Sequence, residues 1–275
     1  NLGEQAADTF HRDQHPDLKA DFILANPPFN QKAWRGANEL VDDPRWMGFP
    51  TPPTSNANYG WILNILSKLS HSGTAALLLA NGALSGDGTE QEIRKELIQQ
   101  GVVEAIILLP RNMFYSTDIS VTLWILARDR SACTAEQNGH MIRYRDRCEE
   151  TLFIDLRAVG EPFEKKYIQF NAEQIASIAS TYHAWQREGY DQPYEDIPEY
   201  CYSATRAEIA AKDYSLVPSK YISFASRDEA VDFATEMQTI QSELSTLMEQ
   251  EAKNTVALGA LFAELGFPLN TSADA

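Results

Sequence analysis

The sequence predicts an α/β domain with a mostly parallel sheet, followed by a mainly helical C-terminal region. Over the first 130 residues, short apolar segments alternate with segments that have helical spacing, as in domains built on a parallel sheet. From Ala230 to Leu265, apolar side chains repeat at spacings of three and four. A chain of 275 residues, 44% of them hydrophobic, is long enough to bury a sizeable core.

The elements of the first domain follow in order along the chain. Apolar runs without helical spacing predict strands at 22–25, 74–79, 102–109 and 121–127. A stripe of apolar residues predicts a helix over 59–69. Thr89 and Glu92 form a potential capping box that opens a second helix, which Gly101 can end. Segment 110–120 is too short for a parallel crossover, so we expect the last two strands to be antiparallel.

Beyond residue 130 the pattern is weaker. The polar stretch 131–138 predicts a domain boundary, and we expect a mixed or irregular extension over 131–225. Within it, a strand at 152–156 and helices at 172–187 and 205–212 are indicated. The predicted organisation is therefore an α/β domain over 1–130, this extension, a long helix over 226–266 and a tail over 267–275.

The long helix carries a heptad seam with polar positions in its middle. Its apolar positions are Ala230, Phe233, Met237, Ile240, Leu244, Leu247, Leu258, Leu261 and Leu265. The outer faces are acidic, so this helix suits a protein partner rather than phosphates. Packing on its own domain is the alternative, but the seam is long for one globular face.

Charge and cysteine content exclude some classes of protein. The formal net charge is −16, which argues against a free-standing nucleic-acid binder. The three cysteines match no zinc template and indicate reduced thiols in a cytoplasmic protein. The five histidines form no spaced cluster, so no metal site is predicted, and no apolar run approaches the length of a membrane span.

The stretch DFILANPPFN runs an apolar strand directly into two prolines and an aromatic residue. Proline fixes φ, lacks an N–H and holds the preceding residue extended, so Pro27 and Pro28 make the exit rigid. The side-chain carbonyl of Asn26 and the backbone carbonyl of Pro27 can both accept from an exocyclic –NH2 group. Phe29 offers a face on which a planar base can stack. These residues predict a site for a flat amino-bearing heterocycle, with a Pro-Pro turn that merely closes the strand as the alternative.

Other residues near this tetrapeptide have two interpretations each. Phe114 and Tyr115 follow a predicted strand and are either a second aromatic contact to the base or part of the core. Trp34 and Trp46 lie in a long loop, which they either order or use to wedge into DNA. The basic residues of the same loop, Lys32, Arg35 and Arg45, contact phosphates or are simply solvated.

Several stretches together give the sequence its family resemblance. DFILANPPFN resembles motif IV of amino-group methyltransferases that use S-adenosylmethionine. The sequence over most of residues 1–225 resembles the modification subunit of type I restriction-modification systems, in the stretches ADFILANPPFN, NANYGWILNILSKLSHSGTAALLLANGALS, EQEIRKELIQQGVVEAIILLPRNMFYSTDISVTLWILAR and AEIAAKDYSLVPSKYI. The resemblance implies part of a Rossmann-like methyltransferase sheet, from the motif IV strand onward, so that residues 1–130 would be the C-terminal half of the catalytic domain.

The resemblance also implies an activity and partners. The activity is N6-methylation of adenine in DNA, with the base flipped out of the duplex and S-adenosylmethionine as methyl donor. Asn26 and Pro27 would hold the amino group, Phe29 would stack on the ring, and Pro28 completes the motif. In that family a DNA-specificity subunit reads the target, two modification subunits clamp the DNA, and a restriction subunit joins the full complex. The C-terminal heptad region would dock on the specificity subunit.

The sequence departs from the family upstream of motif IV. Only 25 residues precede Asn26, so the Gly-rich turn and acidic residue expected for the cofactor are not found there. Asp8 is the one candidate cofactor residue in that segment, beside Asn26 itself. The turn Gly86-x-Gly88 is weak evidence for a cofactor loop and more typical of an ordinary turn. We therefore expect a C-terminal fragment that by itself binds S-adenosylmethionine weakly and does not methylate.

Two other functions remain open at this point. A methyltransferase of the same superfamily that acts on another amino group, such as a protein glutamine or an RNA guanine, has the same tetrapeptide. A non-catalytic assembly module acting through the 230–265 helix is the second alternative. The long stretch of similarity after the tetrapeptide favours the DNA adenine methyltransferase.

Overall fold

The computed structural model describes residues 6–115, 118–137, 139–224 and 233–267, without the side chains of 233–236. The chain divides into two compact units, Asn1–Phe224 and Ala225–Ala275. Each unit is described by itself below.

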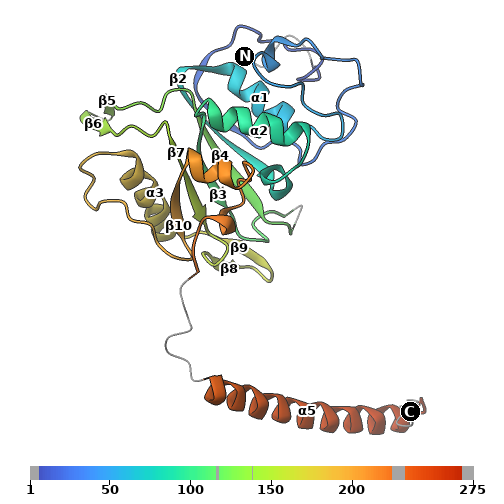
Figure 1. The fold of residues 1–275 in the computed structure, drawn as a ribbon. Helices are drawn as coiled ribbons and strands as arrows, with labels where there is room; N and C mark the ends of the chain where they lie inside the picture. The colour runs from blue at the N-terminus through green and yellow to red at the C-terminus, as the bar shows by residue number, and fades with distance from the viewer. Residues whose placement is uncertain (1–5, 116–117, 138, 225–232, 268–275) are drawn as a thin grey trace. The chain divides into compact units, whose positions relative to one another are not determined.

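A six-stranded sheet forms the centre of the first unit, in the order β1-β2-β4-β3-β7-β10 (Figure 1). Its strands are β1 (Ala20–Ala25), β2 (Leu69–Ala80), β3 (Val103–Leu108), β4 (Val121–Ala127), β7 (Glu150–Asp155) and β10 (Cys201–Thr205). β1 pairs parallel with β2, and β3 pairs parallel with β7. β4 lies antiparallel between β2 and β3, so the antiparallel arrangement expected for the last two predicted strands is present.

The strand directions decide where the loops gather. β1, β2, β3 and β7 run in one direction, so their carboxyl ends meet at the same edge of the sheet. In open α/β sheets this edge is where ligands bind. The segments that follow these four strands therefore form one surface, and the Asn-Pro-Pro-Phe stretch belongs to it.

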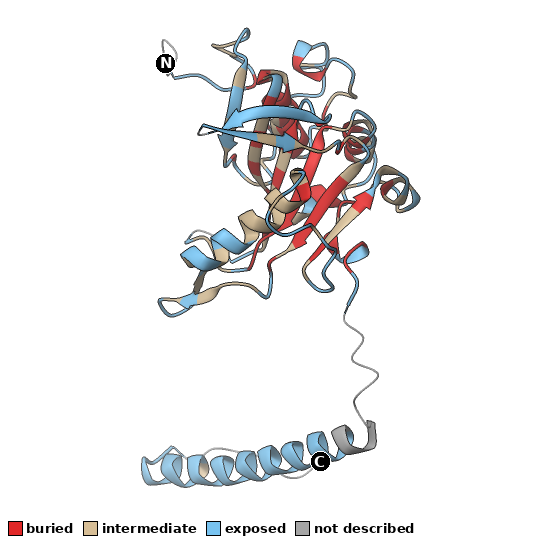
Figure 2. Cartoon of the chain, turned by 90° about the vertical axis from the view of Figure 1, so that its left-hand side faces the viewer, coloured by how far each residue is buried: buried red, intermediate tan, exposed pale blue. Residues whose placement is uncertain are grey.

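Helices cover both faces of the sheet, and each meets an apolar surface made by alternate strand residues. On one face, α1 (Asn58–Lys68) and α2 (Thr89–Gln99) bury Leu63 and Leu97 with Ile106 and Trp124 of the sheet. On the opposite face, α3 (Ala172–Gln186) buries Trp185 over residues of β3 and β7. Figure 2 shows the buried residues concentrated in the strands.

The first turn of α2 differs from the prediction. Its N-cap is Gly88, at φ +61°, and no side chain caps the helix. Thr89 is the first helical residue, one position too late for its hydroxyl to cap the helix, so the predicted capping box is wrong. The predicted stop is present: Gly101 has φ +68°, the left-handed conformation that glycine adopts without steric cost.

The compact unit continues well past the boundary predicted at residue 130. β7 and β10 extend the sheet, and α3 and α4 (Arg206–Ala211) agree with the predicted helices. Two hairpins were not anticipated: β5 (Cys133–Gln137) with β6 (His140–Tyr144), and β8 (Glu161–Phe163) with β9 (Tyr167–Gln169). The described part of the unit also contains the short 3-10 helices η1 (Pro44–Trp46), η2 (Asn81–Leu84) and η3 (Pro218–Lys220).

Strand β1 lies at one end of the strand order. On one face its Ile23 packs against the core beneath α1. On the other face Phe22 and Leu24 are 84% and 86% exposed. This part of the sheet therefore presents apolar side chains to solvent.

In the second unit, α5 extends over Phe233–Glu264. The apolar positions of the predicted seam are exposed along it: Met237, Ile240, Leu244, Leu247, Leu258, Leu261 and Leu265. Ala230 and the tail 268–275 lie outside the described residues. In the described ranges, every helix is too short or too polar to cross a bilayer.

Candidate active site

Asn26 directly follows β1 at the carboxyl edge of the sheet. Ala25 pairs with Leu77 of β2, so Asn26 leaves the sheet beside the end of that neighbouring strand. Its residue is exposed, and its side chain forms no hydrogen bond within the part of the chain that the structure describes. Pro27 is buried and Pro28 is exposed. The Asn26 carbonyl is thus available to a ligand on a strand exit that the core anchors.

The residue after the tetrapeptide is held by α1. Asn30 has φ +50°, a left-handed conformation that is uncommon except for glycine and asparagine. Its backbone N–H donates to Oδ1 of Asn58 at 3.1 Å, and Asn58 Nδ2 donates back to Asn30 Oδ1 at 2.9 Å. Asn58 is the first residue of α1 and is 2% exposed. This reciprocal pair fixes the direction in which the chain leaves the site.

The support of the site extends to α2. Oδ1 of Asn56 accepts from the backbone N–H of Asn58 at 3.0 Å, and its Nδ2 donates to the buried carboxylate of Glu90 in the first turn of α2. Sequence reasoning missed these residues. The signal was the run Asn56-x-Asn58, since asparagines at the start of an apolar helix are typical of polar groups that bind backbone.

Phe29 packs beside the loop that follows β3. Its ring meets that of Phe114 edge to face, with centroids 6.4 Å apart at 86°. Both rings are half-buried and contact the core cluster beneath α3. Of the two aromatic residues predicted in that loop, Phe114 therefore lies against the tetrapeptide. Tyr115 instead is 72% exposed and packs on Tyr167 of β9.

The tryptophans of the long loop serve to order it. Trp34 and Trp46 are 3% and 2% exposed, and their rings pack at 6.2 Å in an edge-to-face geometry. Phe10 lies 4.5 Å from the Trp34 ring. These side chains are part of the core cluster, so the interpretation in which they wedge into DNA is wrong.

Two of the three basic residues in the same loop form contacts within the protein, and the third is exposed. Arg45 is buried, paired with Asp43 at 2.6 Å, and its guanidinium also donates to backbone carbonyls. Arg35 donates to the Pro52 carbonyl at 3.0 Å and to its own loop. Both hold the loop together. Lys32 is exposed and is the one of the three whose position suits contact with a phosphate.

Asp8 accepts hydrogen bonds from the backbone of the turn that it begins. Its Oδ1 accepts from the backbone N–H groups of Phe10 and His11 at 2.8 and 3.0 Å, and the His11 bond holds the pKa of Asp8 below its usual value. Neither contact reaches Asn26, so the structure does not bring the two cofactor candidates together.

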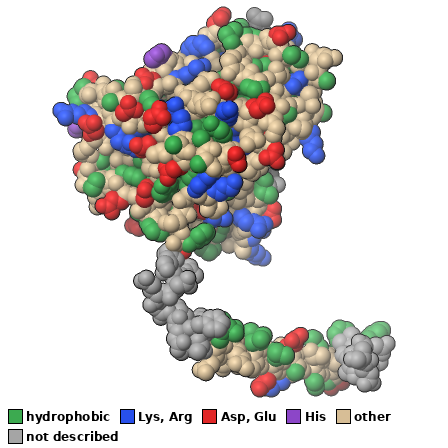
Figure 3. Space-filling view, in the orientation of Figure 1, with side chains coloured by type: hydrophobic (Ala, Val, Ile, Leu, Met, Phe, Trp, Pro, Cys, Tyr) green, Lys and Arg blue, Asp and Glu red, His purple; other side chains and the backbone are tan. Residues whose placement is uncertain are grey.

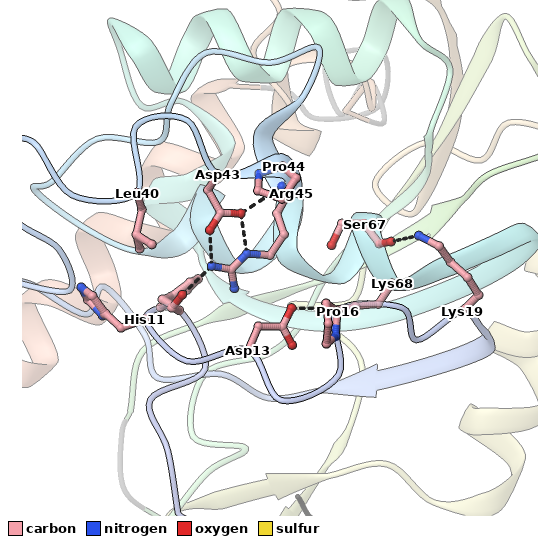
Figure 4. Close-up of a pocket in the computed structure, with 11 residues that line it drawn as sticks. His11, Asp13, Pro16, Lys19, Leu40, Asp43, Pro44, Arg45, Ser67 and Lys68 are labelled. Atoms are coloured by element: carbon pink, nitrogen blue, oxygen red, sulfur yellow. Dashed lines mark hydrogen bonds and ion pairs between the residues drawn. The ribbon is translucent and has the colours of Figure 1, made fainter.

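A cavity of about 360 Å³ lies near this segment, at the opposite end of β1 from Asn26 (Figure 4). Of its charged side chains, Asp43 pairs with Arg45 and Asp13 with Lys68, while Lys19 donates to the backbone carbonyl of Ser67. These contacts lie within the wall of the cavity. The cavity therefore helps to attach the N-terminal segment rather than to bind a charged ligand.

The Gly86-x-Gly88 turn lies directly before α2, where a cofactor loop would bind an anion. The α2 N-terminus behind it carries Glu90 and Glu92. Glu90 lies so close to Gly86 that an added Cβ would meet its carboxylate at 1.8 Å. A carboxylate thus already lies at this turn, which does not fit an anionic ligand and supports the interpretation as an ordinary turn.

Comparison with known proteins gives a consistent result. The family model described as N-6 DNA Methylase matches residues 1–230. The HindI methylase subunit of a type I restriction enzyme from Haemophilus influenzae is 39% identical over 268 residues, covering 97% of this chain and 55% of that protein. The MjaIX methylase subunit of Methanocaldococcus jannaschii is 29% identical, covering 94% of this chain and 45% of that protein.

Solved structures agree in fold. The methyltransferase subunit of a type I restriction-modification system from Streptococcus thermophilus has a TM-score of 0.66 at 27% identity, covering 80% of this chain and 42% of that one. The EcoKI M protein has a TM-score of 0.54 at 18% identity, covering 89% of this chain and 52% of that one, which shows a shared fold.

The mixed sheet, with β4 antiparallel between β2 and β3, and the Asn-Pro-Pro-Phe exit from β1 define a protein of the methyltransferase class. The chain belongs to the N-6 DNA methylase family. It spans about half the length of the curated relatives it matches.

Proposed function

We propose that this chain forms the base-holding part of a DNA adenine-N6 methyltransferase, the modification subunit of a type I restriction-modification system. The observation that supports it most is the exposed Asn26 side chain on a buried Pro27 anchor, at the carboxyl edge of the sheet. Family membership and the type I methylase relatives point to the same chemistry.

The residues act by positioning and electrostatics. Oδ1 of Asn26 and the carbonyl of Pro27 accept the two N–H bonds of the adenine amino group. With both hydrogens held, the nitrogen lone pair is directed out of the ring plane. Phe29 stacks on the flipped base, and Phe114, which packs edge to face with Phe29, limits how far that ring moves.

S-adenosylmethionine supplies an electrophilic methyl group when bound. Among the candidate residues for this cofactor, Asn26 lies at the carboxyl edge of the sheet. Asp8 instead accepts hydrogen bonds within its own turn, and the carboxylate of Glu90 lies against the Gly86-x-Gly88 turn. We therefore assign Asn26 to the acceptor side of the reaction and assign neither Asp8 nor the Gly86-x-Gly88 turn to the donor. We expect the chain alone to bind S-adenosylmethionine weakly and to show no methyl transfer. Micromolar binding in a calorimetric titration would contradict this expectation.

The exposed seam of α5 supports a protein partner. Apolar residues such as Leu244, Leu247 and Leu258 are more than half exposed along a helix of 32 residues. We propose that this seam docks on the DNA-specificity subunit of the complex, which also contains DNA, a second modification subunit and a restriction subunit. A helix that packs on another coil buries such positions.

The alternative acceptor, an amino group of protein glutamine or RNA guanine, uses the same tetrapeptide. The type I relatives, which match nearly the whole chain, favour DNA adenine. A purely structural module is the alternative for this chain in isolation, in line with the weak donor binding that we expect.

The test is Asn26→Ala in the full-length modification subunit, reconstituted with its specificity subunit. Methyl transfer to target DNA should fall on the order of 10²- to 10³-fold, as when one preorganised hydrogen-bonding group is removed. The melting temperature should change by less than about 2 °C, because the Asn26 side chain is exposed.

Asn38→Ala is the matched control, since Asn38 is an exposed asparagine in the next part of the same loop. It should keep wild-type activity. Full activity of Asn26→Ala would refute the proposed function. Transfer to RNA or protein, with none to duplex DNA, would favour the alternative acceptor.

A further inference from the structure

A hairpin lies beside the candidate active site. β8 and β9 follow β7, and so belong to the surface formed at the carboxyl edge of the sheet. The backbone N–H of Ile168 donates to the Asn112 carbonyl at 3.0 Å. This bond attaches β9 to the loop that follows β3, the loop that also carries Phe114.

Ring contacts lead from the tetrapeptide to the hairpin. Phe29 meets Phe114 at 6.4 Å, and the next residue, Tyr115, meets Tyr167 at 4.7 Å and 69°. Tyr115 is 72% exposed, so a large aromatic side chain is held at the surface by its partner ring. The hairpin is therefore placed relative to the tetrapeptide by contacts on successive residues of one loop.

The tip of the hairpin carries free positive charge. Lys165 and Lys166 are exposed, and within the described ranges neither forms an ion pair. The ammonium of Lys166 lies 5.1 Å from the centroid of the Tyr167 ring. Figure 3 shows Lys and Arg side chains gathered at the end of the unit where Figure 1 places β8 and β9.

Two acidic residues of the hairpin offset part of this charge. Glu164 shares the tip, at φ +52°, and opposes one of the two lysines. Glu161 at the base accepts from side-chain amides of Gln169 and Asn171. In a chain with net charge −16, the tip thus offers two exposed lysines, one of them beside the half-buried ring of Tyr167.

Resting on the proposed function, we propose that the β8–β9 tip is a duplex contact, in which Lys165 and Lys166 bind phosphates of DNA next to the target adenine. Phosphate contacts by lysine position a protein on DNA without reading sequence. The contacts from Phe29 through Phe114 and from Tyr115 through Tyr167 place the lysines in the same surface as the tetrapeptide, so the contacted phosphates would belong to the duplex around the flipped base.

The experiment compares wild type with Lys165→Ala/Lys166→Ala in the reconstituted complex of full-length subunits. Each phosphate contact contributes about 0.9 to the slope of log K against log salt, so the slope should fall by about 1.8. The ratio of variant to wild-type Kd should be roughly 12-fold larger at 50 mM than at 200 mM salt. KM for DNA should rise while kcat changes little, because uniform binding is lost.

The control double variant, Lys19→Ala/Lys95→Ala, removes the same charge elsewhere. Lys19 precedes β1 at the opposite edge of the sheet, and Lys95 lies on α2. This variant should keep the wild-type slope. A charge reversal, Lys165→Glu/Lys166→Glu, should reduce binding further at low salt, with an unchanged melting temperature for both hairpin variants.

An unchanged slope for both hairpin variants, in a complex that methylates and loses activity on Asn26→Ala, would overturn the inference and leave the proposed function intact. An inactive wild-type complex, or full activity of Asn26→Ala, would instead refute the proposed function. Loss of assembly with the specificity subunit at a wild-type salt slope would make the tip a protein interface and also overturn the inference.

Discussion

Asn58→Ala tests whether the asparagine pair supports the site. The change removes both hydrogen bonds with Asn30, at 2.9 and 3.1 Å, from a residue that is 2% exposed. Each such bond contributes about 1 kcal/mol net, so the free energy of unfolding should fall by about 2 kcal/mol. For a unit of this size, the melting temperature should fall by roughly 4–8 °C.

Thermal unfolding of the 275-residue chain measures the first effect. In the full-length subunit, methyl transfer should fall as well, since a shift of about 1 Å in a positioned group can cost 10²-fold. Asn58→Ala thus differs from Asn26→Ala, for which activity should fall at constant stability.

Asn30→Gly separates the backbone bond from the side-chain bond. Glycine adopts φ +50° without the roughly 1–2 kcal/mol penalty of a Cβ, and the N–H bond to Asn58 Oδ1 remains. Its stability should therefore stay within about 1 kcal/mol of wild type. The reasoning fails if Asn58→Ala shifts the melting temperature by less than about 1 °C.

Two further predictions concern charged groups. Glu104→Gln leaves the buried guanidinium of Arg147, now 3.0 Å from Glu104, without its carboxylate. Urea unfolding should show that the free energy of unfolding falls by about 3–5 kcal/mol. Arg157→Ala, which removes an ion pair with an exposed arginine, should lower it by at most about 1 kcal/mol, and equal losses in the two variants would refute the argument. The hydrogen bond with Glu39 is the main cause that raises the pKa of His11. The protonated imidazole therefore stabilises the fold fully below its ordinary pKa of 6.5, and this contribution is lost as pH rises through the raised pKa. The melting-temperature difference between wild type and His11→Ala should be larger at about pH 5.5 than at about pH 8.5, and an equal difference would contradict this sign.

The sequence was sufficient for the elements that depend on local pattern. The strand over 121–127 has the bounds of β4, because a continuous apolar run bounded by polar residues leaves little choice. In the structure the compact unit continues past the boundary predicted at 130, because β10 joins the sheet. The sequence pattern did not indicate this strand, since β10 is short and lies at the end of the strand order. Its sequence, CYSAT, needs little apolar character, because much of it is not deeply buried.

The rigid strand exit at the tetrapeptide could be predicted because the effect of proline on the backbone is local. The residues that support this exit could not be predicted, since the bond between Asn30 and Asn58 joins side chains 28 residues apart. The same limit applies to charge. Arg45 and Lys32 look equivalent in sequence, and only the folded loop buries the first and leaves the second exposed. Arg45 is buried where it donates to the carbonyl of Thr9, 36 residues away, and residue type does not encode such a contact.

The left-handed Asn30 and the two prolines before it have a thermodynamic consequence. Pro27 and Pro28 have fixed φ angles, and the Asn30 backbone is held by Asn58. Fixing one residue costs roughly 1–2 kcal/mol of conformational entropy, and here that cost is met when the chain folds. A ligand that arrives at Asn26 then orders little backbone, so a larger share of its contact energy remains as affinity.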